Sequence, residues 1–178
     1  MEHSKRYHAK LYHNLGTLKN DFRNYNLTSL IASKIKGNSV LDIGCGNGYL
    51  LNALSKKGIK TLGIEPNAKL IKLAKIMHPR LKVIKGRAED VGKIQHKFDT
   101  ITMIDVLEHI KDDNLQIRKI YQCLNHGGQM VLVVPAFQFL YGKRDKNNGH
   151  YRRYSKRNLS EKLEKAGFTI SQVRYWNM

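Results

Sequence analysis

The 178-residue sequence lacks the features that would mark a secreted or membrane-spanning protein. It has only two cysteines, Cys45 and Cys123, and their spacing suits neither a disulfide framework nor a metal centre. No apolar run reaches about 18 residues, which excludes a membrane-spanning helix. Residues 1–14 are basic and rich in histidine but have no apolar stretch, so they do not form a secretory signal. We therefore expect a cytoplasmic protein that binds no metal.

Acidic residues are also scarce, since 32 Lys and Arg stand against 14 Asp and Glu, a formal net charge of +18. A positive field of this size attracts nucleic acid, an anionic membrane surface or an acidic substrate. The lysines are spread along most of the expected helices, which is equally compatible with a role in solubility alone. The net charge by itself therefore does not indicate which of these partners the protein binds.

The chain alternates short apolar strands with helices, and it shows no internal repeat. The helices are expected within 5–36 and at 48–57, 67–77, 113–124 and 156–166. The strands are expected at 40–43, 60–64, 81–84, 98–104, 129–134 and 168–175. This alternation predicts an α/β fold with a doubly wound, mostly parallel sheet. We expect an N-terminal helical cap over residues 1–36 and one domain over residues 37–178.

A glycine-rich turn follows the first strand, in the run V-L-D-I-G-C-G-N-G from Val40 to Gly48. Glycines at positions 44, 46 and 48 allow a ligand to approach the backbone where a Cβ atom would collide. A strand, a glycine-rich turn and the start of a helix together form a nucleotide or nucleoside site.

The spacing of this turn argues against a dinucleotide or a phosphate group as the ligand. The fingerprint G-x-G-x-x-G requires a third glycine where Tyr49 stands, and no G-K-[ST] follows the turn. Asp42 lies inside the strand, where its carboxylate would repel a pyrophosphate. It favours a ligand with an amino group and a positive charge.

The run from Val40 to Gly48 resembles the first motif of the class I S-adenosylmethionine (SAM) methyltransferases, and the resemblance extends over roughly residues 40–170. It implies a Rossmann-like fold, with SAM as cofactor, S-adenosyl-L-homocysteine as product, and the glycine turn beside the methionine half of SAM. The family sheet ends with an antiparallel seventh strand, for which this sequence has no segment after 168–175. We therefore expect that this sequence is truncated before that strand, that the strand is missing, or that it comes from a partner.

Glu65 follows Gly44 by 21 positions and closes the second strand, directly before Pro66. An acid about 20 residues after the glycine turn accepts hydrogen bonds from ribose hydroxyls in α/β nucleotide folds. In the resembled family an acidic or amide residue followed by alanine meets the adenine, and here Arg87 precedes Ala88, so that Glu89 or Asp90 is left to accept from the adenine amino group. The predicted cofactor site comprises Asp42, Gly44, Cys45, Gly46, Gly48, Glu65, Pro66, Arg87, Ala88, Glu89, Ile104 and Asp105.

The run D-V-L-E-H from Asp105 to His109 resembles the signature of small-molecule methyltransferases, including the quinone-biosynthesis O-methyltransferases. The carboxyl ends of parallel strands face the ligand crevice, so we expect Asp105 and His109 near the sulfonium. His109 is a candidate general base toward a hydroxyl group. Alternatively, Glu108 and His109 only fix the loop after the strand.

The segment 135–157 is basic and contains G-H-x-R-R-Y, a stretch similar to one in some small-molecule methyltransferases. It supplies His150 as a second candidate base, and the alternative is a solvated basic loop. The catalytic candidates are thus Asp105, His109 and His150. The candidates for substrate binding are Arg23, as a partner for the SAM carboxylate, and Tyr141, Arg152, Arg153 and Tyr154.

Two motifs of nucleic-acid methyltransferases are absent from the fourth strand's end. Positions 105–108 do not read [DN]-P-P-[YF], the motif of enzymes that methylate exocyclic amines or amides, and no cysteine nucleophile lies nearby. We therefore predict methyl transfer to a small-molecule or lipid-linked acceptor, at oxygen, with contact to an anionic membrane as an option. An RNA or protein methyltransferase and a SAM-binding module without catalysis remain the alternatives, and the oligomeric state is not indicated.

Overall fold

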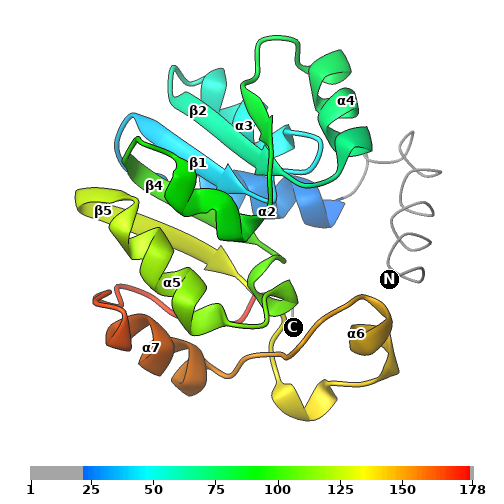
Figure 1. Cartoon of the computed structure of the whole chain (residues 1–178), viewed down its shortest axis with the longest axis vertical. Coiled ribbons are helices and arrows are strands. Elements are labelled where there is room, and N and C mark those ends of the chain that lie inside the picture. Colours follow the sequence, from blue (N-terminus) through cyan, green and yellow to red (C-terminus); the bar gives the residue numbers. More distant parts are fainter. Residues whose placement is uncertain (1–21, 177–178) are drawn as a thin grey trace.

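The computed structural model describes residues 22–176, with side chains from Asn26 onward. Five parallel strands form one sheet in the order β3-β2-β1-β4-β5 (Figure 1). The strands are β1 (Ser39–Ile43), β2 (Lys60–Glu65), β3 (Val83–Lys85), β4 (Phe98–Ile104) and β5 (Leu124–Val133). The order reverses beside β1, which confirms the predicted doubly wound sheet.

Helices pack on both faces of this sheet, because alternate residues of each buried strand point to opposite sides. Val40 of β1 joins a smaller core, in which Leu27 and Ile31 of one helix meet Leu50 and Leu54 of another. Leu41 and Ile43 join a larger core on the other face. The helices are α2 (Phe22–Ala32), α3 (Tyr49–Ser55), α4 (Ala68–Met77), α5 (Asp113–Gln122), α6 (Lys143–Asn147) and α7 (Lys156–Lys165).

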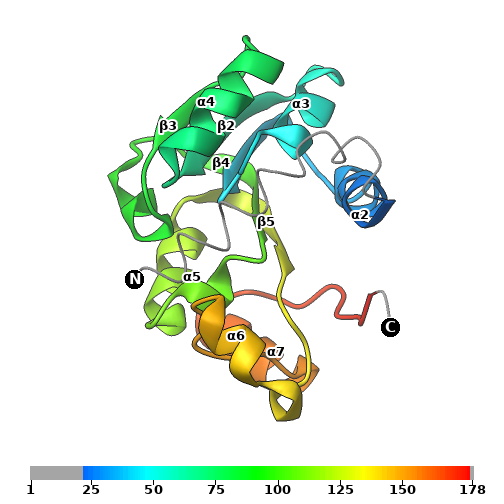
Figure 2. The ribbon, with the colours of Figure 1, turned by 90° about the vertical axis from the view of Figure 1, so that its right-hand side faces the viewer.

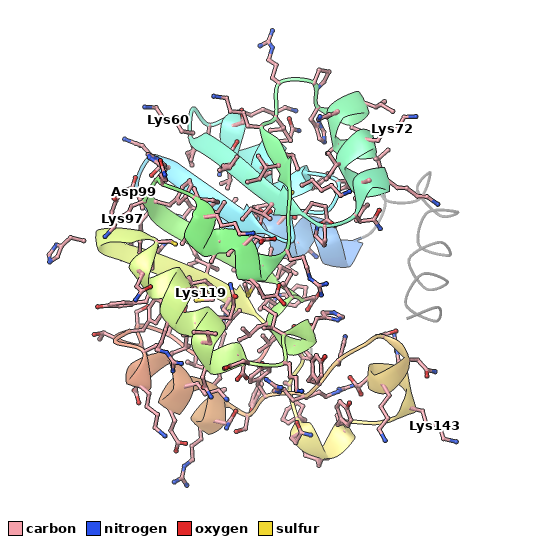
Figure 3. All side chains as sticks on the ribbon, in the orientation of Figure 1. Lys60, Lys72, Lys97, Asp99, Lys119 and Lys143 are labelled. Atoms are coloured by element: carbon pink, nitrogen blue, oxygen red, sulfur yellow. The ribbon has the colours of Figure 1, made fainter. Side chains whose placement is uncertain are left out.

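The expected helical region 5–36 is represented by α2, and residues 1–21 lie outside the described part of the chain. A turn at Gly37 then leads into β1. At the amino end of the sheet the Asp99 carboxylate accepts hydrogen bonds from the backbone N–H groups of Asn38 (2.8 Å) and Ser39 (3.1 Å) and from the side chain of Asn125 (2.7 Å). Figure 3 shows Asp99 at this end of the strands, with Lys60 and Lys97 nearby.

The fifth strand begins earlier than predicted. β5 starts at Leu124, opposite Phe98, and includes Gly127 and Gly128, which the sequence placed in a connection before a strand at 129–134. An irregularity in register between Phe98 and Thr100 accommodates the extra residues. A Cβ atom at Gly128 would lie 2.9 Å from the Asn125 carbonyl oxygen, so this close backbone approach requires glycine.

The predicted strand at 168–175 is wrong, because residues 168–176 have no regular secondary structure and follow α7 as an extended trace (Figure 2). Phe168 and Ile170 pack against the larger core, and Trp176 packs against the smaller one. The Tyr175 ring stacks on Phe137 with 4.6 Å between ring centroids. The apolar side chains of this segment are thus buried by packing, without strand pairing to β5.

The segment 135–157, expected to be a loop, contains two short helices, η4 (Gln138–Leu140) and α6. Its two ends are joined, because Phe137 N–H donates to the Tyr154 carbonyl and Tyr154 N–H donates to the Pro135 carbonyl, both at 2.9 Å. Within the described residues, no helix is both long and apolar enough to cross a membrane.

Candidate active site

The glycine turn after β1 contains three residues with positive φ, Gly44 (76°), Gly46 (57°) and Gly48 (78°), and their surroundings differ. A Cβ atom at Gly44 would collide with Val106, and one at Gly48 would lie 2.7 Å from Leu81 Cδ1. At Gly46, apart from its chain neighbours, no atom of residues 22–176 lies within 4 Å of the position that a Cβ atom would take. Gly44 and Gly48 therefore permit packing, whereas Gly46 borders open space where a ligand can approach the backbone.

Glu65, at the end of β2, holds this turn in place. Its Oε2 atom accepts a hydrogen bond from Gly46 N–H and its Oε1 atom accepts one from Asn67 N–H, both at 2.9 Å. The Ile64 carbonyl accepts two more from the turn, from Gly44 N–H (2.8 Å) and Cys45 N–H (3.1 Å). Each carboxylate oxygen of Glu65 has lone-pair capacity beyond the bond it makes here, so the group can also accept from a ligand's hydroxyls.

Asp42 of β1 is buried beside the turn, and its Oδ1 atom accepts a 2.6 Å hydrogen bond from Thr102 Oγ1. Burial raises the pKa of Asp42 from 3.8 to about 7; the Thr102 hydroxyl opposes this shift and the charge of Glu65 adds to it. A cationic group placed nearby would favour the ionised form. The site thus suits a positively charged ligand better than an anionic one.

The Cys45 side chain turns into the protein, where it packs with Leu51 and Leu81. Burial raises the pKa of its thiol, and the charges of Asp42 and Glu65 raise it further. Cys45 can therefore face a ligand through its backbone but is not a reactive thiol.

The segment after β3 forms a short helix, η2 (Ala88–Lys93). Ala88 is buried, and its carbonyl accepts a 2.8 Å hydrogen bond from the Gln116 side chain. Asp90 caps the helix by accepting from Arg87 N–H at 2.8 Å. Arg87 and Glu89 form an exposed ion pair of 3.7 Å, which leaves the side chain of Glu89 accessible to a ligand.

Asp105 follows Ile104 at the carboxyl end of β4 and has a φ of 51°. Its N–H donates to the Val133 carbonyl of β5 at 3.0 Å. Phe137, which follows β5, is the other non-glycine residue with positive φ in the described chain (65°). Non-glycine residues in this region are uncommon and cluster at functional sites, so both are candidates for shaping the crevice.

Two histidines that lie far apart in the sequence meet beyond Asp105. The rings of His109, in η3 (Leu107–His109), and His150, after α6, pack edge to face with 4.6 Å between centroids. His150 Nδ1 lies 3.1 Å from Asp145 Oδ1. The two candidate bases thus belong to one cluster.

Two acids of this cluster were not among the predicted site residues. Glu108 is buried, and burial raises its pKa to about 8, with Asp105 and Asp145 adding to the shift against an opposing backbone hydrogen bond. Asp145 is buried too; burial opposes its ionisation, but hydrogen bonds from Arg153, Gly142 and His150 lower its pKa to about 2. The signal for Asp145 was its place as the one acid among seven Lys and Arg between positions 143 and 157.

The other predicted substrate residues are bonded within the protein. Arg152 pairs with Asp113 at 2.9 Å, and Tyr154, which is buried, donates to the same carboxylate at 3.0 Å. Arg153 binds Asp145 at 2.8 Å. Tyr141 donates to the His150 carbonyl at 2.8 Å. These contacts hold the segment 135–157 against the domain. Arg23 belongs to α2, but its side chain lies outside the described structure.

Comparison with known proteins identifies the family. A family model described as a methyltransferase domain matches residues 7–173. The chain belongs to the class I SAM-dependent methyltransferases. The predicted fold and family are thereby confirmed for this methyltransferase domain.

Curated relatives match the domain over about half of its length. The ubiquinone biosynthesis O-methyltransferase of Azorhizobium caulinodans is 30% identical over 102 residues, which cover 55% of this chain and 40% of that protein. The tRNA U34 carboxymethyltransferase of a Sulfurovum species is 35% identical over 104 residues, which cover 55% of this chain and 34% of that protein. The matched regions thus span about two fifths or less of these relatives.

The solved structures resemble the methyltransferase domain in fold. The YcgJ protein of Bacillus subtilis superposes with a TM-score of 0.75 at 20% identity, over 86% of this chain and 73% of that one. At this identity the likeness concerns the arrangement of the sheet and helices alone.

Proposed function

We propose that this domain transfers a methyl group from SAM to an oxygen atom of a small-molecule or lipid-linked acceptor. The observation that carries the proposal is the open space at Gly46, whose N–H donates to the Glu65 carboxylate, with the buried Asp42 in the strand that leads into this turn. It lies at the same edge of the sheet as Asp105 and the His109–His150 pair, since parallel strands end together at this edge.

The residues around the turn fit SAM group by group. Glu65 accepts from the ribose hydroxyls, and Asp42 offers a negative charge to the cationic methionine portion. The backbone at Gly44, Cys45, Gly46 and Gly48 provides a surface on which the ligand lies. Pro66, Arg87, Ala88, Glu89, Ile104 and Asp105 complete the site. When bound, SAM supplies a methyl group already activated by the sulfonium, so the protein contributes chiefly positioning.

A hydroxyl acceptor loses a proton during methylation, and His150 is the better-supported base. Asp145 is ionised at neutral pH and accepts from Nδ1–H, which leaves Nε2 to take the acceptor's proton. The same carboxylate then stabilises the imidazolium, as carboxylates do beside catalytic histidines. His109, whose ring touches that of His150, is the alternative base.

An apolar acceptor tail is favoured by a groove of about 1510 Å³ along β5. Its lining includes Asp105, Val131, Val133, Phe137 and Tyr175. Pockets for small ligands usually measure roughly 300–1,000 Å³, so this groove has room for a chain attached to the reacting group. The net charge of +18 favours an anionic acceptor or an anionic membrane surface beside it.

RNA is the second candidate acceptor. It is supported by the same charge and by the relative named as a tRNA U34 carboxymethyltransferase. Binding to RNA would weaken steeply with added salt, because basic side chains displace counterions from phosphates. A small neutral acceptor would show little dependence on salt.

We also propose that residues 1–36 act as a cap on the domain formed by residues 37–178. In the described part, α2 packs on α3 through Leu27 and Ile31 in the smaller core. A cap held in this way can cover the crevice while it remains attached to the domain.

The deciding experiment uses radiolabelled SAM with cell extract separated into lipid, small-molecule and RNA pools. The proposal predicts label in the lipid or small-molecule pool, reduced by His150→Ala and unchanged by His96→Ala, whose histidine is exposed and lies outside the groove. Label in RNA alone would support the second candidate. Bound SAM without transfer to any pool would indicate a module that does not catalyse.

A further inference from the structure

Three side chains near the crevice form a group that can coordinate a metal ion as well as accept a proton. Glu108, His109 and His150 each offer one ligating atom, and these atoms lie within 4.8 Å of one another. It is the single group of three or more such residues found in the described part of the chain. The expectation that no metal binds was based on cysteine spacing and did not consider this group.

The buried carboxylate of Glu108 is unsatisfied. Glu108 is 1% exposed, and its Oε2 atom has no hydrogen-bond partner among the described residues. A buried carboxylate oxygen without a partner is costly, and such atoms call for a specific explanation. The backbone around it is fixed, because the Glu108 carbonyl accepts a 2.8 Å hydrogen bond from Tyr151 N–H. That bond also brings the segment of His150 against the segment of His109.

His150 is oriented in the manner of a metal ligand. Its Nδ1 atom faces Asp145 Oδ1 at 3.1 Å, so Nε2 is the atom that can donate a lone pair. Asp145 is held in turn by Arg153 Nε at 2.8 Å and by Gly142 N–H at 3.0 Å. A carboxylate that fixes the second nitrogen of a histidine is the usual support of a ligating imidazole.

We infer that Glu108, His109 and His150 bind one divalent transition-metal ion, with Asp145 as the support of His150. Two imidazoles and one carboxylate suit Zn²⁺ and neighbouring first-row ions, which they bind at about 2.0–2.2 Å. Neighbouring ligand atoms then lie roughly 3–3.5 Å apart, so atoms separated here by up to 4.8 Å must move closer when the ion binds. Three protein ligands leave at least one position for a further ligand.

The open position would take an oxygen of the acceptor, a step that rests on the proposed function. On binding the ion, an acidic hydroxyl such as a phenol or enol releases its proton to water and becomes a metal-bound oxyanion. The oxyanion forms the new C–O bond as the S–CH₃ bond of the sulfonium breaks, which leaves a neutral thioether. With the metal bound, His109 and His150 are ligands and do not act as bases.

The test is metal binding by the full chain, without acceptor. Protein freed of metal by a chelator is titrated with ZnCl₂ in a calorimeter. We expect one site that is lost in Glu108→Gln, His109→Ala and His150→Ala and kept in His126→Ala, whose histidine is exposed. Replacing His3, His8 and His13 by alanine removes the histidines that precede the described residues and should leave the site intact. Equal binding by the parent and the cluster variants would overturn the inference.

If the cluster variants fail to fold, a second measurement on the folded parent still tests the metal site. CoCl₂ added to the metal-free parent should give visible absorption bands of a four- or five-coordinate ion, displaced by ZnCl₂. Asp145→Asn should weaken the affinity roughly 10- to 100-fold and retain the bands. Absence of bands in the folded parent would overturn the inference.

Failure of this inference is distinguishable from failure of the proposed function. If SAM binding and methyl transfer persist in a chelator, the metal has no role in the reaction, and the proposed methyltransferase function stands. If the protein binds the metal but transfers a methyl group to no acceptor, the metal site is supported and the proposed function is contradicted.

Discussion

Glu65 Oε2 accepts a 2.9 Å hydrogen bond from the backbone N–H of Gly46, across 19 positions of the chain. The bond connects the end of β2 to the one glycine of the turn that borders open space. The carboxylate assigned to the ribose therefore also sets the shape of the surface on which the ligand lies. Recognition and loop geometry are coupled through one side chain.

Glu65→Gln tests this coupling. The amide keeps one acceptor oxygen, but its NH₂ group must face either Gly46 N–H or Asn67 N–H, so one donor loses its partner. An unsatisfied donor costs about 1–3 kcal/mol, so SAM affinity should fall roughly 10- to 100-fold in calorimetry. Glu161→Gln, at an exposed position on α7, is the control. Equal affinities in the two variants would contradict the assignment.

Asp42 predicts a loss of stability as the pH rises. Its pKa is about 7 in the folded protein and 3.8 when exposed, so the folded state binds more protons between these values. The free energy of unfolding should therefore decrease from about pH 4 to pH 7 and stay low above it. Asp42→Asn, which still accepts from Thr102, should show a smaller decrease in urea titrations over that range, because the raised pKa of Glu108 contributes a decrease in both proteins. A parallel decrease in both proteins would exclude Asp42 as its source.

For Asp99 we predict the opposite pH dependence, a free energy of unfolding that decreases as the pH falls. Hydrogen bonds from Asn125, Asn38 and Ser39 lower its pKa from 3.8 to about 2. Its contribution to stability is present above about pH 4 and is lost as the pH falls toward 2. Asp99→Asn should be destabilised by ~1–3 kcal/mol at pH 7. The difference from the parent should shrink in urea titrations near pH 2; a constant difference would refute the assignment.

Asp113 anchors the segment 135–157 to α5. Its carboxylate accepts from Lys162 (2.9 Å), Arg152 (2.9 Å) and the Tyr154 hydroxyl (3.0 Å). Asp113→Ala leaves two cations without their partner and should cost about 2–4 kcal/mol in chemical denaturation, near the lower end for a broken buried ion pair.

The exposed pair of Arg157 and Glu161 on α7 is the matched control for Asp113. It spans one turn of a single helix in solvent, so Glu161→Ala should produce no measurable change. Similar losses in the two variants would show that burial is not what makes the Asp113 network matter.

The sequence predicted best the strands whose short, partly apolar segments are followed by glycine or end at an acid. β1, β2 and β4 begin and end within one residue of the expected positions. The segment 168–175 has similar apolar side chains, but a strand also needs a neighbouring backbone with which to pair. The local pattern of apolar residues does not show whether such a neighbour is present. The five-residue helix α6 is too short to show a helical pattern.

The cofactor side of the site was more predictable than the acceptor side. Gly46 and Glu65 lie in one strand-turn-helix unit and the strand that follows it, where spacing along the chain corresponds to spacing in the fold. His109 and His150 are 41 positions apart, and their contact depends on the bond between Glu108 and Tyr151 and on the folding of the segment 135–157. Glu108 was interpreted at most as a residue that fixes the loop, because only the structure reveals its buried and unpartnered oxygen.

The most direct measurement is a calorimetric titration with SAM of the parent, Gly46→Arg and Gly58→Arg. Both glycines have positive φ, 57° and 81°, and in the described part of the chain neither has an atom beyond its chain neighbours within 4 Å of an added Cβ, so the two substitutions carry a similar backbone cost. The account predicts that Gly58→Arg binds SAM like the parent and that Gly46→Arg shows no binding. Parent-like affinity in Gly46→Arg would contradict the location of the cofactor against this turn.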